Sequence, residues 1–144
     1  MMYPKHEQDF YGWAVSTAQL LREKKMNEVD FDNIIEEIEA LGVSEKHQII
    51  NRLSLVISHL LKWQYQPNIR GHSWVYTIKE QRDQARFHLE DNPSLKSRLN
   101  EILSRAYTLG VSKAAKDTSF DKKDFPKECP YTFDQVMDDN FYPN

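Results

Sequence analysis

The stretch that decides the fold is SEKHQIINRLSLVISHLLKWQYQ, residues 44–66. Its apolar positions are Ile49, Ile50, Leu53, Leu55, Val56, Ile57, Leu60, Leu61 and Trp63. On a helix, at about 100° per residue, these positions cover more than half of the circumference. A helix that is apolar on so many sides needs several neighbours, which predicts the buried centre of a helical bundle.

The two segments before it show narrower apolar stripes. A helix is predicted from Asp9, as its cap, to about Arg22. A second helix opens at Asp30, and Gly42 is expected to end or bend it. Its stripe, which we expect to form a packed face, consists of Phe31, Ile34, Ile35, Ile38 and Leu41.

Two more helices are predicted after the central one. Pro67 should stop the central helix, and Ser73 can cap the next, whose stripe is Val75, Ile78, Arg82, Ala85 and Leu89. Asn92-Pro93 then opens a helix that continues to about Lys116. The remaining tail is irregular except for one short helix from Thr132, which forms a capping box with Gln135.

These patterns predict an all-α protein, because no stretch shows the two-residue alternation of a strand. The expected architecture is a four- or five-helix bundle around a central buried helix. A chain of 144 residues has the usual length of one domain. We therefore expect a single helical domain over residues 1–144, with its core in residues 9–116 and a wrapping tail in residues 117–144.

Composition excludes several classes of function. The net charge of −3 argues against a nucleic-acid-binding surface. No apolar run approaches the ~20 residues of a membrane-spanning helix, and the N-terminus lacks the apolar core of a signal peptide. Cys129 is the single cysteine, which fits a reducing compartment. The sequence predicts a soluble, cytoplasmic protein without a membrane partner.

Arg82 is an unusual residue for its position, since it lies inside an apolar stripe. An arginine there has to reach water or meet a carboxylate. We expect a buried ion pair with a carboxylate of the second helix, Glu37 before Glu39. The alternative is an anion or substrate site with Arg82 at its floor.

His59 lies in the most apolar segment and is interpreted as a hydrogen-bonded core residue, with a ligand or base as the alternative. No two histidines are three or four residues apart, so no helix presents two histidine ligands on one face. A metal site would need separate helices to converge, for example through Glu37, His59 and His72. We therefore predict no metal and no cofactor.

Aromatic and cationic residues alternate around the turn after the central helix, where Arg70 lies between Trp63 and Trp74. Such interleaving can stack bases. It also suits a hinge at which both tryptophans fold over the turn and are substantially buried, which is the interpretation we favour.

Several blocks of the sequence resemble a small bacterial family catalogued as domain of unknown function twenty-nine. They are Asp9–Trp13, Glu36–Gly42, His59–Pro67, Arg70, Ser73-Trp74 and Cys129–Tyr131. The resemblance implies an all-helical domain and no particular activity. The same blocks contain Glu37, His59 and Arg70, which together with Arg82 form our candidate polar cluster.

Two classes of function therefore remain open. The first is a non-catalytic interaction module that binds itself or another protein. The second is a small enzyme or metal-binding domain with a polar pocket formed by Glu37, His59 and Arg82. No catalytic residue is assigned, and the two classes differ in whether these side chains converge on an open cavity.

Overall fold

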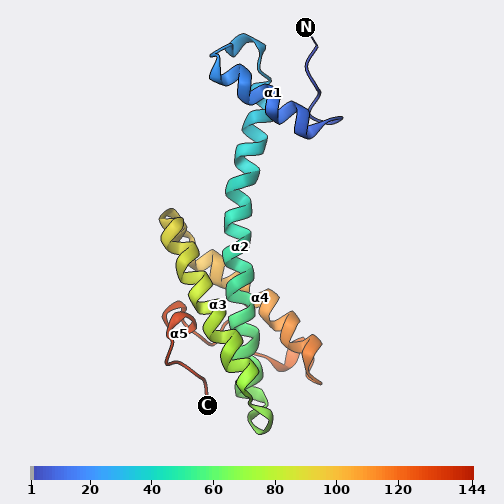
Figure 1. Cartoon of the computed structure of the whole chain (residues 1–144). Coiled ribbons are helices and arrows are strands. Elements are labelled where there is room, and N and C mark those ends of the chain that lie inside the picture. The colour runs from blue at the N-terminus through green and yellow to red at the C-terminus, as the bar shows by residue number, and fades with distance from the viewer. Residues whose placement is uncertain (1) are drawn as a thin grey trace. The chain divides into compact units, whose positions relative to one another are not determined.

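The computed structural model describes residues 2–144, and in this part of the chain all regular structure is helical (Figure 1). The α-helices are α1 (Phe10–Arg22), α2 (Phe31–Tyr65), α3 (His72–Asp91), α4 (Leu99–Asp117) and α5 (Phe133–Met137). Short 3-10 helices are η1 (Met26–Glu28), η2 (Pro67–Ile69), η3 (Pro93–Arg98) and η4 (Lys122–Asp124). The predicted all-α class is confirmed.

The chain forms two compact units, Met1–Val43 and Ser44–Asn144. The first unit contains α1, η1 and the beginning of α2. The second contains the remainder of α2 and everything that follows it. None of the helices within residues 2–144 is both long enough and apolar enough to cross a membrane.

The core of the second unit surrounds α2, which contacts α3 and α4, as the breadth of its apolar surface predicted (Figure 1). The α2 side chains that are wholly buried include Ile49, Leu53, Val56, Ile57, Leu60 and Leu61. Each contributes roughly 1.5–3 kcal/mol through burial of its apolar surface. Burial of these side chains makes α2 a large contributor to the stability of the bundle.

Gly110 lies where α4 closely approaches α2. A Cβ atom at this glycine would lie 2.9 Å from Cγ2 of Ile57 and 3.2 Å from the carbonyl oxygen of Ser54. Both contacts are tighter than real side chains normally allow, so the absence of a side chain lets the two helices pack this closely.

The predicted caps of α1 and α5 are observed, whereas Ser73 is not a cap, because α3 already begins at His72 with Gly71 as its N-cap. Oδ1 of Asp9 accepts a 3.0 Å hydrogen bond from the Gly12 amide at the start of α1. Thr132 and Gln135 form the expected capping box, with bonds of 3.1 Å and 2.9 Å, so the short tail helix begins where the sequence placed it. These side chains satisfy amides that the first turn of a helix leaves without partners.

Two further helix boundaries differ from the prediction. Gly42 does not end a helix, because the 35-residue α2 runs through it from Phe31 to Tyr65. No glycine in the described chain has the positive φ of a helix-ending glycine, and an interior glycine costs only about 1 kcal/mol relative to alanine. After Asn92, the chain first forms the 3-10 helix η3, and α4 begins at Leu99.

The first unit has little core of its own. Trp13, Thr17 and Leu20 of α1 are the buried side chains among residues 2–43. The prediction that the apolar stripe of the second predicted helix forms a packed face is wrong, because four of its five residues are exposed. They are Phe31, Ile35, Ile38 and Leu41, whose exposed fractions are 47, 50, 62 and 68%.

Candidate functional site

Arg82 of α3 is wholly buried and binds the C-terminal tail. Its Nε donates a 2.7 Å hydrogen bond to the carbonyl oxygen of Val136. Its Nη2 donates to the carbonyl oxygens of Phe141 at 2.9 Å and Gln135 at 3.3 Å. The predicted ion pair with Glu37 is therefore wrong, because backbone carbonyls occupy the place of the expected carboxylate.

The reason lies in how α5 ends. A helix leaves its last carbonyls without partners inside the helix, and these carbonyls carry partial negative charge. Gln135 and Val136 belong to the last turn of α5, so a cation is favourable beside them. Burial lowers the pKa of Arg82 below its ordinary value, with Tyr142 and nearby carboxylates acting in the opposite direction.

Arg82 also contains the one polar side-chain atom of the described residues that is buried without a hydrogen-bond partner, Nη1. The ring of Tyr142 lies over the guanidinium, 5.4 Å from Cζ to the ring centroid. Aromatic faces attract cations, so Tyr142 offsets part of the cost of that burial.

Arg70, which lies between η2 and α3, also binds the C-terminal tail. Its Nε donates to the carbonyl oxygen of Trp63 at 2.8 Å, and its Nη2 donates to that of Pro143 at 3.5 Å. The guanidinium lies 4.8 Å from the centre of the Trp63 ring. Trp63 in turn packs against Tyr142, with ring centroids 5.0 Å apart.

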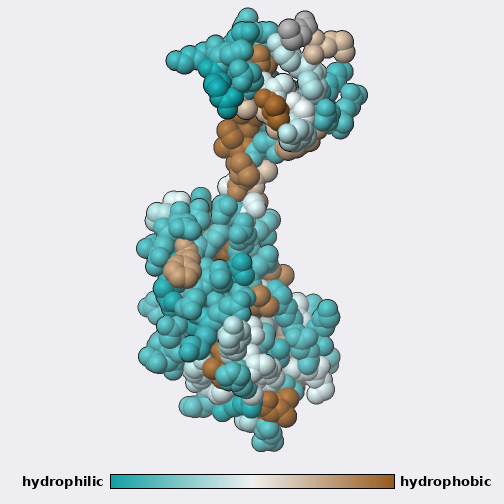
Figure 2. Space-filling model, viewed as in Figure 1, coloured by the Kyte–Doolittle hydropathy of each residue, from teal (hydrophilic) through white to brown (hydrophobic). Residues whose placement is uncertain are grey.

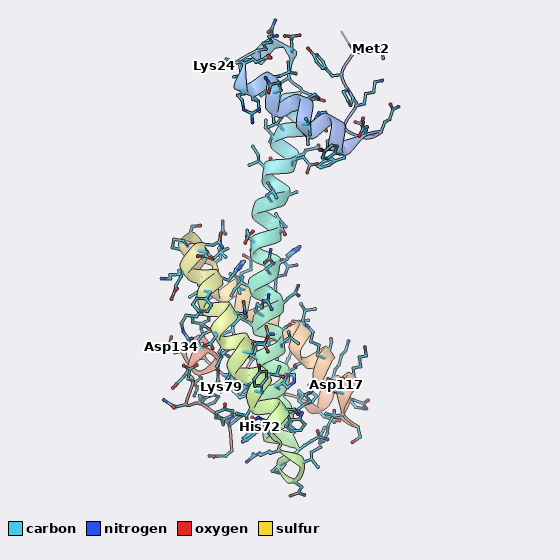
Figure 3. All side chains as sticks on the ribbon, viewed as in Figure 1. Met2, Lys24, His72, Lys79, Asp117 and Asp134 are labelled. Atoms are coloured by element: carbon cyan, nitrogen blue, oxygen red, sulfur yellow. The ribbon has the colours of Figure 1, made fainter. Side chains whose placement is uncertain are left out.

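Trp74 is partly buried, as is Trp63, and it lies near a buried lysine. Nζ of Lys62 is 5.5 Å from the centre of the Trp74 ring. The same Nζ atom donates a 3.2 Å hydrogen bond to Asp117 at the end of α4, a residue labelled in Figure 3. The cations at this turn thus have partners inside the chain.

His59 is half-buried on α2, and its partners are backbone and hydroxyl groups of the same helix. Its Nδ1 lies 2.9 Å from the carbonyl oxygen of Leu55, to which it donates, and 3.2 Å from Oγ of Ser58. Burial lowers the pKa of His59 below its ordinary value of 6.5, against the smaller opposing effect of the Leu55 carbonyl. The imidazole is thus held by groups of its own helix.

Glu37 belongs to the first unit and bonds there to the N-terminal segment. Its Oε1 lies 2.6 Å from Nε2 of His6. The His6 ring packs edge-on against Trp13, with centroids 4.6 Å apart, and against Phe10 at 5.3 Å. This contact fixes the segment before α1 onto the beginning of α2.

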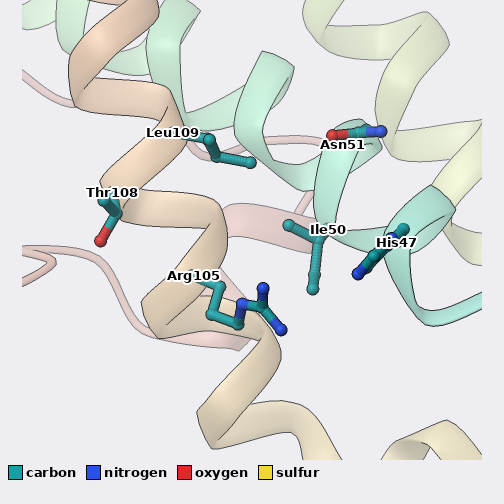
Figure 4. A pocket seen from close by; sticks show the side chains of 6 residues that line it. All are labelled: His47, Ile50, Asn51, Arg105, Thr108 and Leu109. Carbon is teal, nitrogen blue, oxygen red and sulfur yellow. The ribbon is translucent and has the colours of Figure 1, made fainter. Parts of the chain in front are cut away.

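The four candidate polar residues therefore form separate interactions. Arg70 and Arg82 share the tail as their partner, while His59 and Glu37 each bond elsewhere. Among residues 2–144, no group of three or more His, Cys, Asp or Glu side chains is arranged to hold a metal ion. A cleft of about 430 Å³ between α2 and α4 contains none of the four (Figure 4). It is lined by His47, Ile50, Asn51, Arg105, Thr108 and Leu109.

The feature that sequence reasoning missed is the surface of the first unit. Of the 14 large hydrophobic residues exposed in the described chain, ten lie in residues 2–43. Brown hydrophobic atoms are visible on this unit in Figure 2. We name the exposed residues Phe31, Ile35, Ile38 and Leu41 the α2 apolar face. Its helical spacing was visible in the sequence, but periodicity does not distinguish a face that packs within the chain from one that packs against another molecule.

The family model for the domain of unknown function DUF29 matches residues 5–142, which is nearly the whole chain and spans both units. The chain belongs to this family, and the resemblance seen in the sequence is confirmed. No curated protein and no solved structure matches the chain.

Proposed function

We propose that this chain is a helical interaction module that binds a protein partner through the α2 apolar face. The observation that carries the proposal is the concentration of exposed apolar side chains in one unit. Residues 2–43 are less than a third of the chain and contain ten of its 14 exposed large hydrophobic residues. Exposed apolar side chains that share one face of a helix, as those of the α2 apolar face do, are typical of surfaces that bind other proteins.

The size of the first unit supports the same function. At about 40 residues, a folded unit usually needs a disulfide, a metal or a partner, because too little of its surface can be buried. The one cysteine of the chain, Cys129, lies outside this unit. Within residues 2–144 no metal-binding group is found. A partner that covers the α2 apolar face would supply apolar contacts to a unit whose own buried side chains are few.

Site-specific photo-crosslinking in the cells that make the protein tests this proposal. A photoreactive phenylalanine analogue at Ile38 is expected to give a defined adduct with a macromolecule. The matched control is the same analogue at Phe87 of α3, an exposed apolar residue of the second unit, which should give little adduct. Equal and diffuse labelling from the two positions, or none from Ile38, would contradict the proposal.

A further inference from the structure

We infer that the partner of the α2 apolar face is a basic amphipathic helix, an inference that rests on the proposed function. The geometry of the face favours a helix. Phe31, Ile35 and Ile38 have the i, i+4, i+7 spacing by which one helix packs its apolar stripe against another. With Leu41 they lie within an arc of about 120°, the width of one packing face.

The charge around this face determines which helix fits. Asp32 and Glu39 are exposed and lie about 40–60° around the helix from Ile35, so they border the face. On the opposite border, Glu37 lies about 40° from Leu41 and is bonded to His6. No lysine or arginine occurs between Lys25 and Lys46. The apolar face therefore has acidic borders and no cation of its own helix beside it.

The whole first unit has the same sign of charge. Residues 1–43 contain nine Asp or Glu against four Lys or Arg, a formal charge of −5 in a chain whose total is −3. Two helices that pack side by side choose partners through the charges that border their apolar stripes. Acidic borders repel a second copy of the same helix and attract lysine or arginine borders. A basic partner is thus favoured over self-association.

The test titrates the full-length protein with two synthetic 18-residue helical peptides of matched amphipathicity, one built from leucine and lysine and the other from leucine and glutamate. We expect saturable one-to-one binding of the Leu/Lys peptide and none of the Leu/Glu peptide. Ile35→Gln with Ile38→Gln should weaken the binding at least about tenfold. Tyr76→Gln with Phe87→Gln, which changes two exposed apolar residues of α3, should leave it unchanged.

The contribution of charge is tested separately. Asp32→Asn with Glu39→Gln should weaken binding of the Leu/Lys peptide several-fold and reduce its dependence on salt. Glu80→Gln with Glu90→Gln removes two exposed charges of α3 and should leave binding of the Leu/Lys peptide unchanged. Equal loss in both pairs would mean that the peptide responds only to net charge, and would overturn the inference.

Sedimentation of the protein alone separates this inference from the proposed function. We expect a monomer at all concentrations. A dimer that Ile35→Gln with Ile38→Gln dissociates would overturn the basic partner and keep the interaction module, with a second copy as the occupant. Failure of the Leu/Lys peptide to bind, with a defined crosslink still obtained from Ile38, would likewise overturn only the basic partner. Absence of that crosslink would contradict the proposed function itself.

Discussion

Nε of Arg82 donates a hydrogen bond of 2.7 Å to the carbonyl oxygen of Val136, which lies 54 residues further along the chain. The bond joins a wholly buried cation on α3 to the last turn of α5. It explains how a tail with a single five-residue helix is attached to the bundle.

Replacement of Arg82 by methionine should destabilise the protein by roughly 3–5 kcal/mol, because three tail carbonyls would lose a charged donor inside the protein. Urea unfolding measures this change in the free energy of unfolding. Lys79→Met is the control, since Lys79 is exposed on the same helix (Figure 3) and should change stability by less than about 0.5 kcal/mol. Equal effects of the two substitutions would contradict the structural role of Arg82.

Replacement by alanine should change the stability of the protein in opposite directions at two glycines on different helices. Gly110→Ala places a methyl group 2.9 Å from Ile57 and should cost about 1–3 kcal/mol, as overpacked cores do. Gly42→Ala meets nothing within 4 Å and should stabilise α2 by roughly 0.5–1 kcal/mol. Thermal unfolding of both variants checks the pair. A stabilised Gly110→Ala variant would mean that α4 does not approach α2 this closely. A destabilised Gly42→Ala variant would mean that α2 is interrupted at Gly42.

Stability should fall as the pH is lowered below about 6.5, in part because of His59. Its pKa is lowered in the folded protein, so between the folded and unfolded pKa values the unfolded chain binds the proton more readily. This contribution to stability is present above pH 6.5 and is lost as the pH falls toward the folded pKa. His59→Gln should therefore show a shallower decrease in unfolding free energy than the wild type. Identical profiles for the variant and the wild type would contradict burial of His59.

Trp63→Ala should destabilise the protein by about 2–4 kcal/mol, somewhat less than a fully buried tryptophan would. The ring is partly buried between Arg70 and Tyr142, and its loss also removes a support of the tail. Chemical unfolding monitored by circular dichroism measures the effect. Stability within about 0.5 kcal/mol of the wild type would favour the exposed, ligand-stacking interpretation of this residue instead.

Local sequence patterns predicted much of this structure. The breadth of the apolar surface around Leu53 identified the central helix, and the Thr132–Gln135 capping box placed α5 correctly. Patterns of this kind are local, and the partner of Arg82 is not. A buried arginine requires acceptors, but the sequence gives no reason to prefer the tail carbonyls over a carboxylate such as Glu37. Periodicity likewise marked Ile38 as part of a packing face without showing that this face is exposed in the structure.

The measurement that tests the central claim most directly is the free energy of unfolding of the Ile35→Gln, Ile38→Gln variant. Both side chains are at least half exposed in the structure, at 50% and 62%, so their loss should change the stability of the free protein by less than about 1 kcal/mol. The matched core variant, Ile49→Gln, should lose roughly 3–5 kcal/mol, because Ile49 is wholly buried. A comparable loss in the Ile35, Ile38 variant would show that the α2 apolar face is already covered in the free protein, and would contradict its role as a binding surface.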